Sequence, residues 1–147
     1  MMKINDQDQS LKLFVVLSRA VQTITKRVEE DIKTYGLNPT EFAVLELLYS
    51  KGDQPIQKIG EKVLLASSSI TYVVDKLEKK NFLFRKPCPK DRRVTYAAIT
   101  EEGTQLMNDI FPKHREAIQD IFGGLDENEK ENMIVQLKKL GFYAKDL

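Results

Sequence analysis

The feature that most constrains the fold is the stretch KPCPKDRRVTYAAITEEG, residues 86–103. Two prolines bracket a cysteine, and three basic residues and one acid then crowd a short turn. The flanking segments FLFRKP and VTYAAIT have strand composition, and the second alternates along its length. The pattern predicts a β-hairpin. Because a two-stranded hairpin is not stable alone, it must lean on a core that the rest of the chain provides.

Helical periodicity occupies most of the chain before this hairpin. Apolar residues recur every three or four positions over residues 8–34, which predicts a long helix that ends at Tyr35-Gly36. A second helix is predicted in LNPTEFAVLELLYSKGD, with Thr40 as its N-cap and Gly52 at its end. The segment PIQKIGEKV predicts a short third helix with its proline near the first turn, and LLA after it predicts a tight turn.

The fourth predicted helix is SSSITYVVDKLEKKN, which Ser67 can cap and which Asn81 can end in the left-handed conformation. Its apolar stripe, with the spacing i, i+3, i+4 and i+7, consists of Ile70, Val73, Val74 and Leu77. After the hairpin, Thr100 is the expected N-cap of a fifth helix that runs to about Phe122. A last helix is expected to start near Asp126. The predicted fold class is therefore mainly α with a small β-hairpin wing.

Charge is nearly balanced over the 147 residues, at +1, but it is unevenly distributed. Residues 58–93 hold 10 basic and 4 acidic side chains, whereas residues 94–147 hold 6 basic and 10 acidic ones. A basic centre predicts a localised anion-binding surface, and the alternative is a solvated lysine-rich helix. No apolar run approaches the roughly 20 residues of a membrane span. One cysteine and a polar N-terminus favour a cytoplasmic protein without an internal disulfide.

The third and fourth helices read together as a helix-turn-helix, in which the second helix enters the major groove of DNA. The N-terminal end of that helix carries hydroxyl groups that can hydrogen-bond base edges, and its later lysines suit the phosphate backbone. The candidate DNA contacts on this helix are Ser67, Ser68, Ser69, Thr71, Tyr72, Lys76 and Lys79. Double-stranded DNA is thus the predicted partner.

A hairpin directly after such a helix makes a wing, whose tip carries Lys90, Arg92 and Arg93. Arginine is favoured in a narrow minor groove by the enhanced negative potential there. Asp91 is out of place against a polyanion unless its task is local. A carboxylate can hold a guanidinium in one orientation through two hydrogen bonds, so we expect Asp91 to orient a neighbouring arginine.

The segment CPKDRRVTYAAITEEG resembles the wing signature of the MarR family of winged helix-turn-helix regulators: Asp-x-Arg, a strand, then Leu/Ile-Thr-x-x-Gly. SSSITYVVDKLEKKNF resembles the recognition helix of that family. The chain departs from the family pattern at Gly60, a position usually held by Ala, and at Asn81, which replaces the usual Gly. The resemblance covers nearly the whole chain. It implies a winged-helix lobe at residues 37–100 and dimerisation helices at residues 1–36 and 101–147. Within the family, the chain is similar to Gram-positive repressors of quinone and phenolic detoxification genes.

The resemblance also implies roles for single residues. Arg93 is the minor-groove arginine, Asp91 is its orienting partner, and Arg92 lies near phosphate. An inducer pocket is implied between the dimerisation helices and the DNA-binding lobe, and ordinary core packing is the alternative for its apolar members. The candidates are Phe14, Arg19, Val21, Ile24, Tyr35, Phe42, Leu45 and Met107, with Arg19 and Tyr35 as the polar ones.

Other chemistries find little support in the sequence. Cys88, between two prolines and near basic residues, could be a redox sensor or an incidental thiol. His114 and Cys88 are too few for the usual three or four metal ligands, and His114 is expected at the surface or an interface. The serine run lacks a nucleophile elbow. We therefore expect no enzymatic activity, no cofactor and no metal.

The function predicted from these patterns is a homodimeric transcriptional regulator that reads a pseudo-palindromic operator. Repression by the free protein and release by a phenolic or quinone-like ligand are expected, although activation is not excluded. Two alternatives stay open at this point. One is a thiol-based repressor that uses Cys88, and the other is a winged helix that binds proteins instead of DNA. Steep loss of affinity with salt would distinguish DNA binding from the second alternative.

Overall fold

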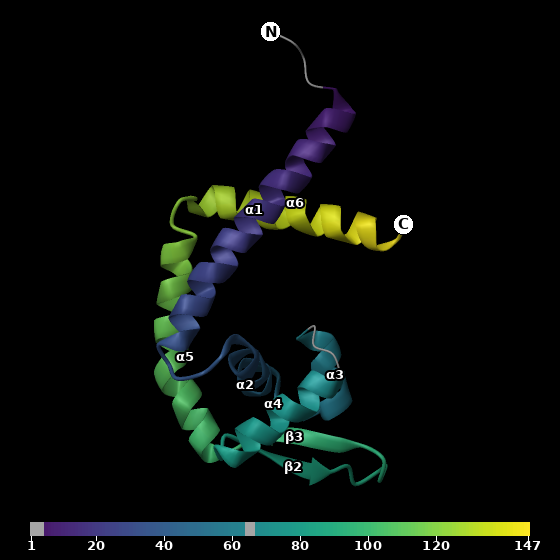
Figure 1. Ribbon diagram of the computed structural model, residues 1–147, viewed down its shortest axis with the longest axis vertical. Helices are drawn as coiled ribbons and strands as arrows, with labels where there is room; N and C mark the ends of the chain where they lie inside the picture. The colour runs from purple at the N-terminus through teal and green to yellow at the C-terminus, as the bar shows by residue number, and fades with distance from the viewer. Residues whose placement is uncertain (1–4, 64–66) are drawn as a thin grey trace.

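The computed structural model describes residues 5–63 and 67–147 (Figure 1). The elements follow in the order α1 (Asp6–Lys33), α2 (Pro39–Lys51), β1 (Gln54–Pro55), α3 (Ile56–Lys62), α4 (Ser67–Lys79), β2 (Leu83–Pro87), β3 (Thr95–Ile99), α5 (Glu101–Ile121) and α6 (Glu127–Lys145). The hairpin and every predicted helix are present. The turn predicted in LLA lies outside the described residues.

Figure 1 shows a lobe made of α2, α3, α4 and the sheet at one end of the molecule. Helix α5 leads away from this lobe beside the C-terminal half of α1, and α6 turns off from the far end of α5. The N-terminal half of α1 and all of α6 therefore extend beyond the lobe. None of the described helices is long and apolar enough to cross a membrane.

The sheet has a third strand that the sequence did not predict. Its order is β1-β3-β2, both pairings are antiparallel, and Gln54 of β1 pairs with Ala97 of β3. Two residues are too short to show a strand periodicity, so only the tertiary pairing reveals β1. Pro55 is tolerated there because β1 lies at the edge of the sheet. Lys62 also donates to the Gln54 side chain at 2.8 Å, which ties α3 to β1.

Most helix ends lie where the sequence placed them, with one correction. Gly36, Gly52 and Asn81 take positive φ angles of 78°, 81° and 65°. Helix α2, however, is capped by Asn38 and not by Thr40. The Asn38 side chain accepts from the Glu41 amide at 2.8 Å, and the Glu41 carboxylate accepts from the Asn38 amide at 3.0 Å. This reciprocal capping box, with proline at the first helical position, starts the helix earlier.

The core lies in the lobe and against the first half of α5. The predicted stripe of α4 is buried and meets α2, α3 and β2. Its fully buried partners include Leu45, Leu48, Ile59, Leu83 and Met107. Helix α5 approaches the sheet closely at Gly103, where a Cβ atom would lie 2.2 Å from the Phe82 carbonyl oxygen.

Helix α1 up to Val21 and the whole of α6 carry large apolar side chains that this protomer leaves exposed. Helix α6 buries none of its residues. Exposed fractions reach 70% at Phe14 and Tyr143. The other members of this exposed apolar set are Leu11, Leu13, Val15, Val16, Val21, Met133, Ile134, Val135, Leu137, Leu140 and Phe142. A single protomer therefore leaves much apolar surface in water, which is unusual for a monomer.

Candidate nucleic-acid interface and ligand pocket

The outer face of α4 presents polar side chains away from the core, as a recognition helix must. Ser69, Thr71, Tyr72 and Lys79 are exposed, with Tyr72 at 66%, and Lys76 is half-buried. The side chains of Ser67 and Ser68 lie outside the described part of the structure, and so does the predicted cap by Ser67. The described face offers hydroxyls and lysines together, which suits hydrogen bonds to base edges and to phosphates.

The wing tip shows the carboxylate–guanidinium pair expected from the sequence. Asp91 Oδ1 accepts from the Arg93 backbone N–H at 3.0 Å and from Arg93 Nε at 3.2 Å, and Asp91 Oδ2 accepts from Nη2 at 3.4 Å. These hydrogen bonds from the Arg93 backbone and side chain hold the pKa of Asp91 below its usual value. The Arg93 side chain is 90% exposed, so its orientation is set while it remains free to reach a groove. Lys90 and Arg92 are exposed beside it.

A second arginine, which sequence reasoning missed, joins the wing to the recognition helix. Arg85 of β2 donates from Nη2 to Asp75 at 2.6 Å and from Nη1 to Glu78 at 2.5 Å, and both acids belong to α4. The hydrogen bond with Asp75 raises the pKa of Arg85, burial opposes it, and the charges of both acids add to the rise. Acids at positions 75 and 78 were the available signal, because residues three apart share a helix face.

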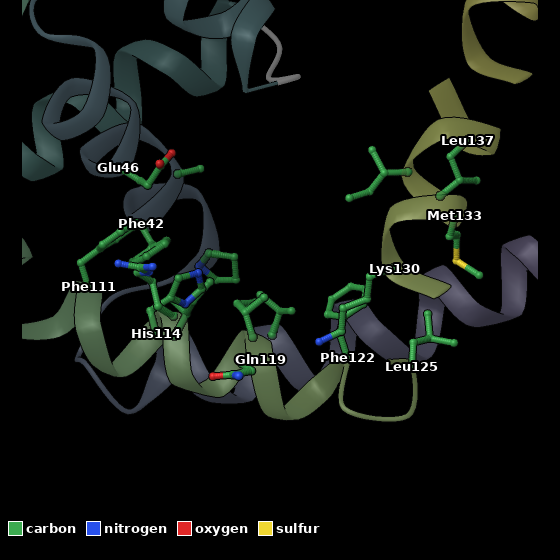
Figure 2. Close-up of a pocket in the computed structure, with 17 residues that line it drawn as sticks. Phe42, Glu46, Phe111, His114, Gln119, Phe122, Leu125, Lys130, Met133 and Leu137 are labelled. Atoms are coloured by element: carbon green, nitrogen blue, oxygen red, sulfur yellow. The ribbon is translucent and has the colours of Figure 1, made fainter. Parts of the chain in front are cut away.

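An apolar cavity of about 780 Å³, which we call the α6 cavity, lies beside helix α6. Helices α1, α2 and α5 form one wall, and α6 forms the other. Figure 2 shows Phe42, Glu46 and His114 on one side of the opening and Met133 and Leu137 on the other. The remaining lining residues are Val28, Ile32, Pro39, Ala43, Phe111, Arg115, Ile118, Gln119, Phe122, Leu125, Lys130 and Ile134. The cavity therefore lies between the lobe and the exposed apolar helix α6.

The sequence predicts His114 at the surface or at an interface, and the structure excludes only an exposed surface position within this protomer. Its side chain is only 14% exposed, and Nδ1 lies 2.9 Å from Oδ2 of an equally buried Asp31. Asp31 also accepts from the Tyr35 hydroxyl at 2.7 Å. Burial, followed by this hydrogen bond and the Asp31 charge, raises the pKa of Tyr35 to about 12. His114 is buried because α5 packs on α1 and α2 and its ring meets Phe42 at 4.6 Å between centroids.

The eight predicted ligand residues do not gather at this cavity. Phe42 lines it, whereas Leu45 and Met107 are fully buried in the core. Tyr35 is half-buried, and its hydroxyl donates to Asp31. The remaining four lie along α1 outside the cavity lining: Phe14, Arg19 and Val21 are exposed, and Ile24 is half-buried. Sequence reasoning missed Glu46 and His114, because only the packing of α5 on α2 brings them together.

Comparison with known proteins decides the family. The MarR family pattern matches residues 37–95, from just before α2 through the wing arginine. The chain is 59% identical to the HTH-type transcriptional regulator MhqR of Bacillus subtilis (strain 168) over 138 residues, which cover 94% of this chain and 95% of MhqR. The chain belongs to the MarR family. This MarR-family chain is accordingly a DNA-binding transcriptional regulator with a winged helix-turn-helix.

Solved structures share the fold of this MarR-family chain. Sco3205 of Streptomyces coelicolor, solved in complex with DNA, superposes with a TM-score of 0.81 at 16% identity, over 96% of this chain and 89% of Sco3205. CouR of Rhodococcus jostii RHA1, solved with p-coumaroyl-CoA bound, gives a TM-score of 0.76 at 26% identity, over 88% of this chain and 92% of CouR. The MarR fold thus extends over α1, α5 and α6 as well as the lobe.

Proposed function

We propose that this regulator is a homodimeric repressor that holds operator DNA and releases it when a small aromatic ligand enters the α6 cavity. One observation carries the proposal. The cavity is lined on one side by α2, which packs against the recognition helix, and on the other by α6, which belongs to the exposed apolar surface. An occupant therefore touches both the reading lobe and the proposed dimer region.

The exposed apolar set on α1 and α6 supports the homodimer. Pairing of these helices with a second copy would remove their side chains from water. We assign residues 1–36 and 101–147 to this dimerisation region and residues 37–100 to the winged-helix lobe. Two lobes related by a two-fold axis would read the half-sites of a pseudo-palindrome about 34 Å apart. The more acidic C-terminal third lies outside the lobe, and in the dimer it would face away from the DNA.

The proposed DNA contacts follow from the exposed groups of the lobe. The hydroxyls and the ring of α4 lie against base edges, Lys76 and Lys79 bind phosphates, and the wing tip enters the minor groove. Arg93 is the inserted side chain, Asp91 orients it, and Lys90 and Arg92 meet the flanking phosphates. The described α4 residues in this set are Ser69, Thr71 and Tyr72, and Ser67 and Ser68 complete it by their place in the sequence.

The cavity favours a planar ligand that carries a hydroxyl or a quinone oxygen. Phe42, Phe111 and Phe122 supply aromatic surface, and His114 and Glu46 are the polar groups of the inner wall. Asp31 holds Nδ1 of His114, so the second ring nitrogen can exchange a hydrogen bond with a ligand oxygen. The p-coumaroyl-CoA bound to CouR carries an aromatic acyl group, which is chemistry of the same kind. Phenols and quinones are therefore the ligand class that we propose.

Release of DNA follows from differential binding. A ligand shifts the protein only as far as it prefers one arrangement of lobe and dimerisation helices over the other. A ligand that bridges α2 and α6 would favour a separation of the two lobes that no longer matches successive major grooves. The regulator would act in the cytoplasm, where its DNA and such metabolites meet.

The test begins with a genome-wide footprint of the purified protein, which yields an operator duplex. Anisotropy titrations of that duplex then compare a panel of phenols and quinones. We expect at least one of them to weaken binding by the parent, and Phe42→Ala to lose this response while it keeps its affinity for the free duplex. Cys88→Ser serves as the control, because an intact response in that variant excludes the thiol as the sensor. An affinity that no compound in the panel changes would contradict the proposed ligand class.

A further inference from the structure

The wing and the recognition helix are joined by the Arg85 clamp, which we define as Arg85 with Asp75 and Glu78. Besides the two guanidinium contacts, Glu78 Oε2 accepts from the Arg85 backbone N–H at 3.3 Å. Three hydrogen bonds thus connect the middle of β2 to two successive turns of α4. The Arg85 side chain is only 30% exposed, so the guanidinium lies between strand and helix and does not extend into solvent.

The position of the clamp along β2 allows it to control how the wing is oriented relative to α4. On β2, Leu83 anchors the base of the hairpin in the core, and Arg85 pairs with Ala97 of β3 two residues closer to the tip. The next residue, Lys86, bonds Asp53 before β1 and does not bond α4. Among the side-chain hydrogen bonds of the described chain, those of Arg85 are the outermost that join the hairpin to the recognition helix. They therefore set the separation between the α4 face and Arg93.

The clamp also reduces the negative charge near the DNA-binding face, because one guanidinium offsets one of the two carboxylate charges. Asp75 lies on the exposed side of α4 with Tyr72 and Lys79, and Glu78 lies one turn on toward the wing. Two free carboxylates beside a polyanion would oppose binding. Arg85 matches both with one planar guanidinium, a geometry that lysine cannot reproduce.

We propose that Arg85 is a positioning residue of the DNA-binding lobe. It fixes the wing at the separation from α4 at which Arg93 and the recognition helix can engage one DNA duplex together. Arg85 acts through Asp75 and Glu78 and need not touch DNA. This inference rests on the DNA-binding face described above, and binding by the parent protein in the same assay tests that face separately.

Two variants separate positioning from simple charge. Arg85→Ala lowers the net charge by one, whereas Asp75→Asn/Glu78→Gln raises it by two. If Arg85 contributed only positive charge near DNA, the first variant would bind more weakly and the second more tightly. Positioning predicts that both weaken operator binding, by about tenfold or more, because both break the same contacts. The operator affinity of Arg85→Lys should fall between that of Arg85→Ala and that of the parent. Arg27→Ala, which breaks an exposed ion pair on α1, is the matched control.

A second readout follows the wing itself. In a Cys88→Ser background, a nitroxide at Lys90→Cys reports the mobility of the wing tip by electron paramagnetic resonance. We expect a sharper, more mobile spectrum in Arg85→Ala and in Asp75→Asn/Glu78→Gln, and an unchanged spectrum in Arg27→Ala, with circular dichroism confirming that all are folded. Tighter binding by Asp75→Asn/Glu78→Gln, or wing mobility that stays at the parent level in both variants, would overturn the proposal.

Discussion

At the scale of single residues, the wing shows how a negative charge, that of Asp91, can support a site that is otherwise positively charged. Asp91 directs its acceptors to the backbone and side chain of Arg93, and so stiffens the residue that follows it by two. In the proposed complex, the exposed guanidinium would reach DNA with less orientational freedom to lose, which would lower the entropic cost of binding. The same hydrogen bonds hold the pKa of Asp91 below its ordinary value.

Arg93→Ala should therefore weaken operator binding by about 1–3 kcal/mol, and Asp91→Ala should weaken it by less. The first removes the inserted side chain, and the second only releases its orientation. Anisotropy with the footprinted duplex measures both, and Arg27→Ala on α1 should match the parent. If Arg93→Ala binds as tightly as the parent, the proposed wing contact is wrong.

Gly103 is a residue whose identity is required by a close approach. A Cβ there would lie 2.2 Å from the Phe82 carbonyl oxygen and 2.8 Å from Ile99 Cγ1. Gly103→Ala must push α5 off the sheet, and we expect it to lower the free energy of unfolding by about 1–3 kcal/mol. Gly141→Ala in α6 meets nothing within 4 Å and should raise it slightly. Urea unfolding of both variants measures the contrast, and equal effects would refute the packing argument.

At the scale of elements, an ion pair between a buried carboxylate and a partly exposed lysine connects the start of α2 to the end of α4. Glu41 is 2% exposed and accepts from Lys80 Nζ at 2.8 Å, while it also completes the capping box with Asn38. Burial alone would raise the pKa of Glu41, but the hydrogen bonds from Lys80 and Asn38 and the nearby positive charges lower it overall. The capped helix and the recognition helix are thus held together by one carboxylate.

This pair makes part of the stability depend on pH. Because the folded-state pKa of Glu41 is lowered, its contribution is full above its ordinary value of 4.5 and is lost as pH falls through the lowered folded value. Glu41→Gln should lower the free energy of unfolding at pH 7 by roughly 1–3 kcal/mol, and the deficit should shrink below pH 4.5. Chemical unfolding at several pH values tests this. Glu30→Gln, an exposed acid, should show neither effect, and a deficit that is constant with pH would contradict the assignment.

At the scale of the whole molecule, the apolar surface of α1 and α6 and the charge of the lobe point to different partners. The exposed apolar set predicts an interface with a second copy of the chain, and the basic lobe predicts binding to a polyanion. Leu140→Asp, which puts a charge on a side chain 42% exposed on α6, should convert the protein to a monomer and abolish operator binding. Sedimentation equilibrium measures the first effect. Lys138→Gln, which makes the same change in net charge on the opposite face of α6, should remain dimeric, and a dimeric Leu140→Asp would place the interface elsewhere.

DNA binding and protein binding by the lobe differ in their dependence on salt. If the lysines and arginines of α4 and the wing meet phosphates, the logarithm of affinity should fall linearly and steeply with the logarithm of salt concentration. Lys79→Ala should reduce that slope by about one unit and weaken binding to all sequences alike. Titrations from 50 to about 200 mM salt measure the slope. A flat dependence would instead favour the protein-interaction alternative.

What the sequence determined by itself was local. Helical periodicity, the cap at Thr100, the start of the last helix near Asp126, the left-handed Asn81, the hairpin and the Asp91–Arg93 pair all depend on residues close together in the chain. The structure confirms each. The Thr40 cap failed because Asn38 competes with it two residues away and Pro39 favours the earlier start.

The tertiary structure decided what distant residues do together. Three features could not be predicted from the periodicity of the sequence, because each needs two elements to pack side by side. They are the pairing of β1 with β3, the bond between Asp31 and His114 across 83 positions, and the α6 cavity. The Arg85 clamp is intermediate, since its partners are only seven and ten residues away but lie on another element. Local secondary structure can be predicted from the spacing of side chains along the chain, whereas a site between elements depends on how whole helices pack.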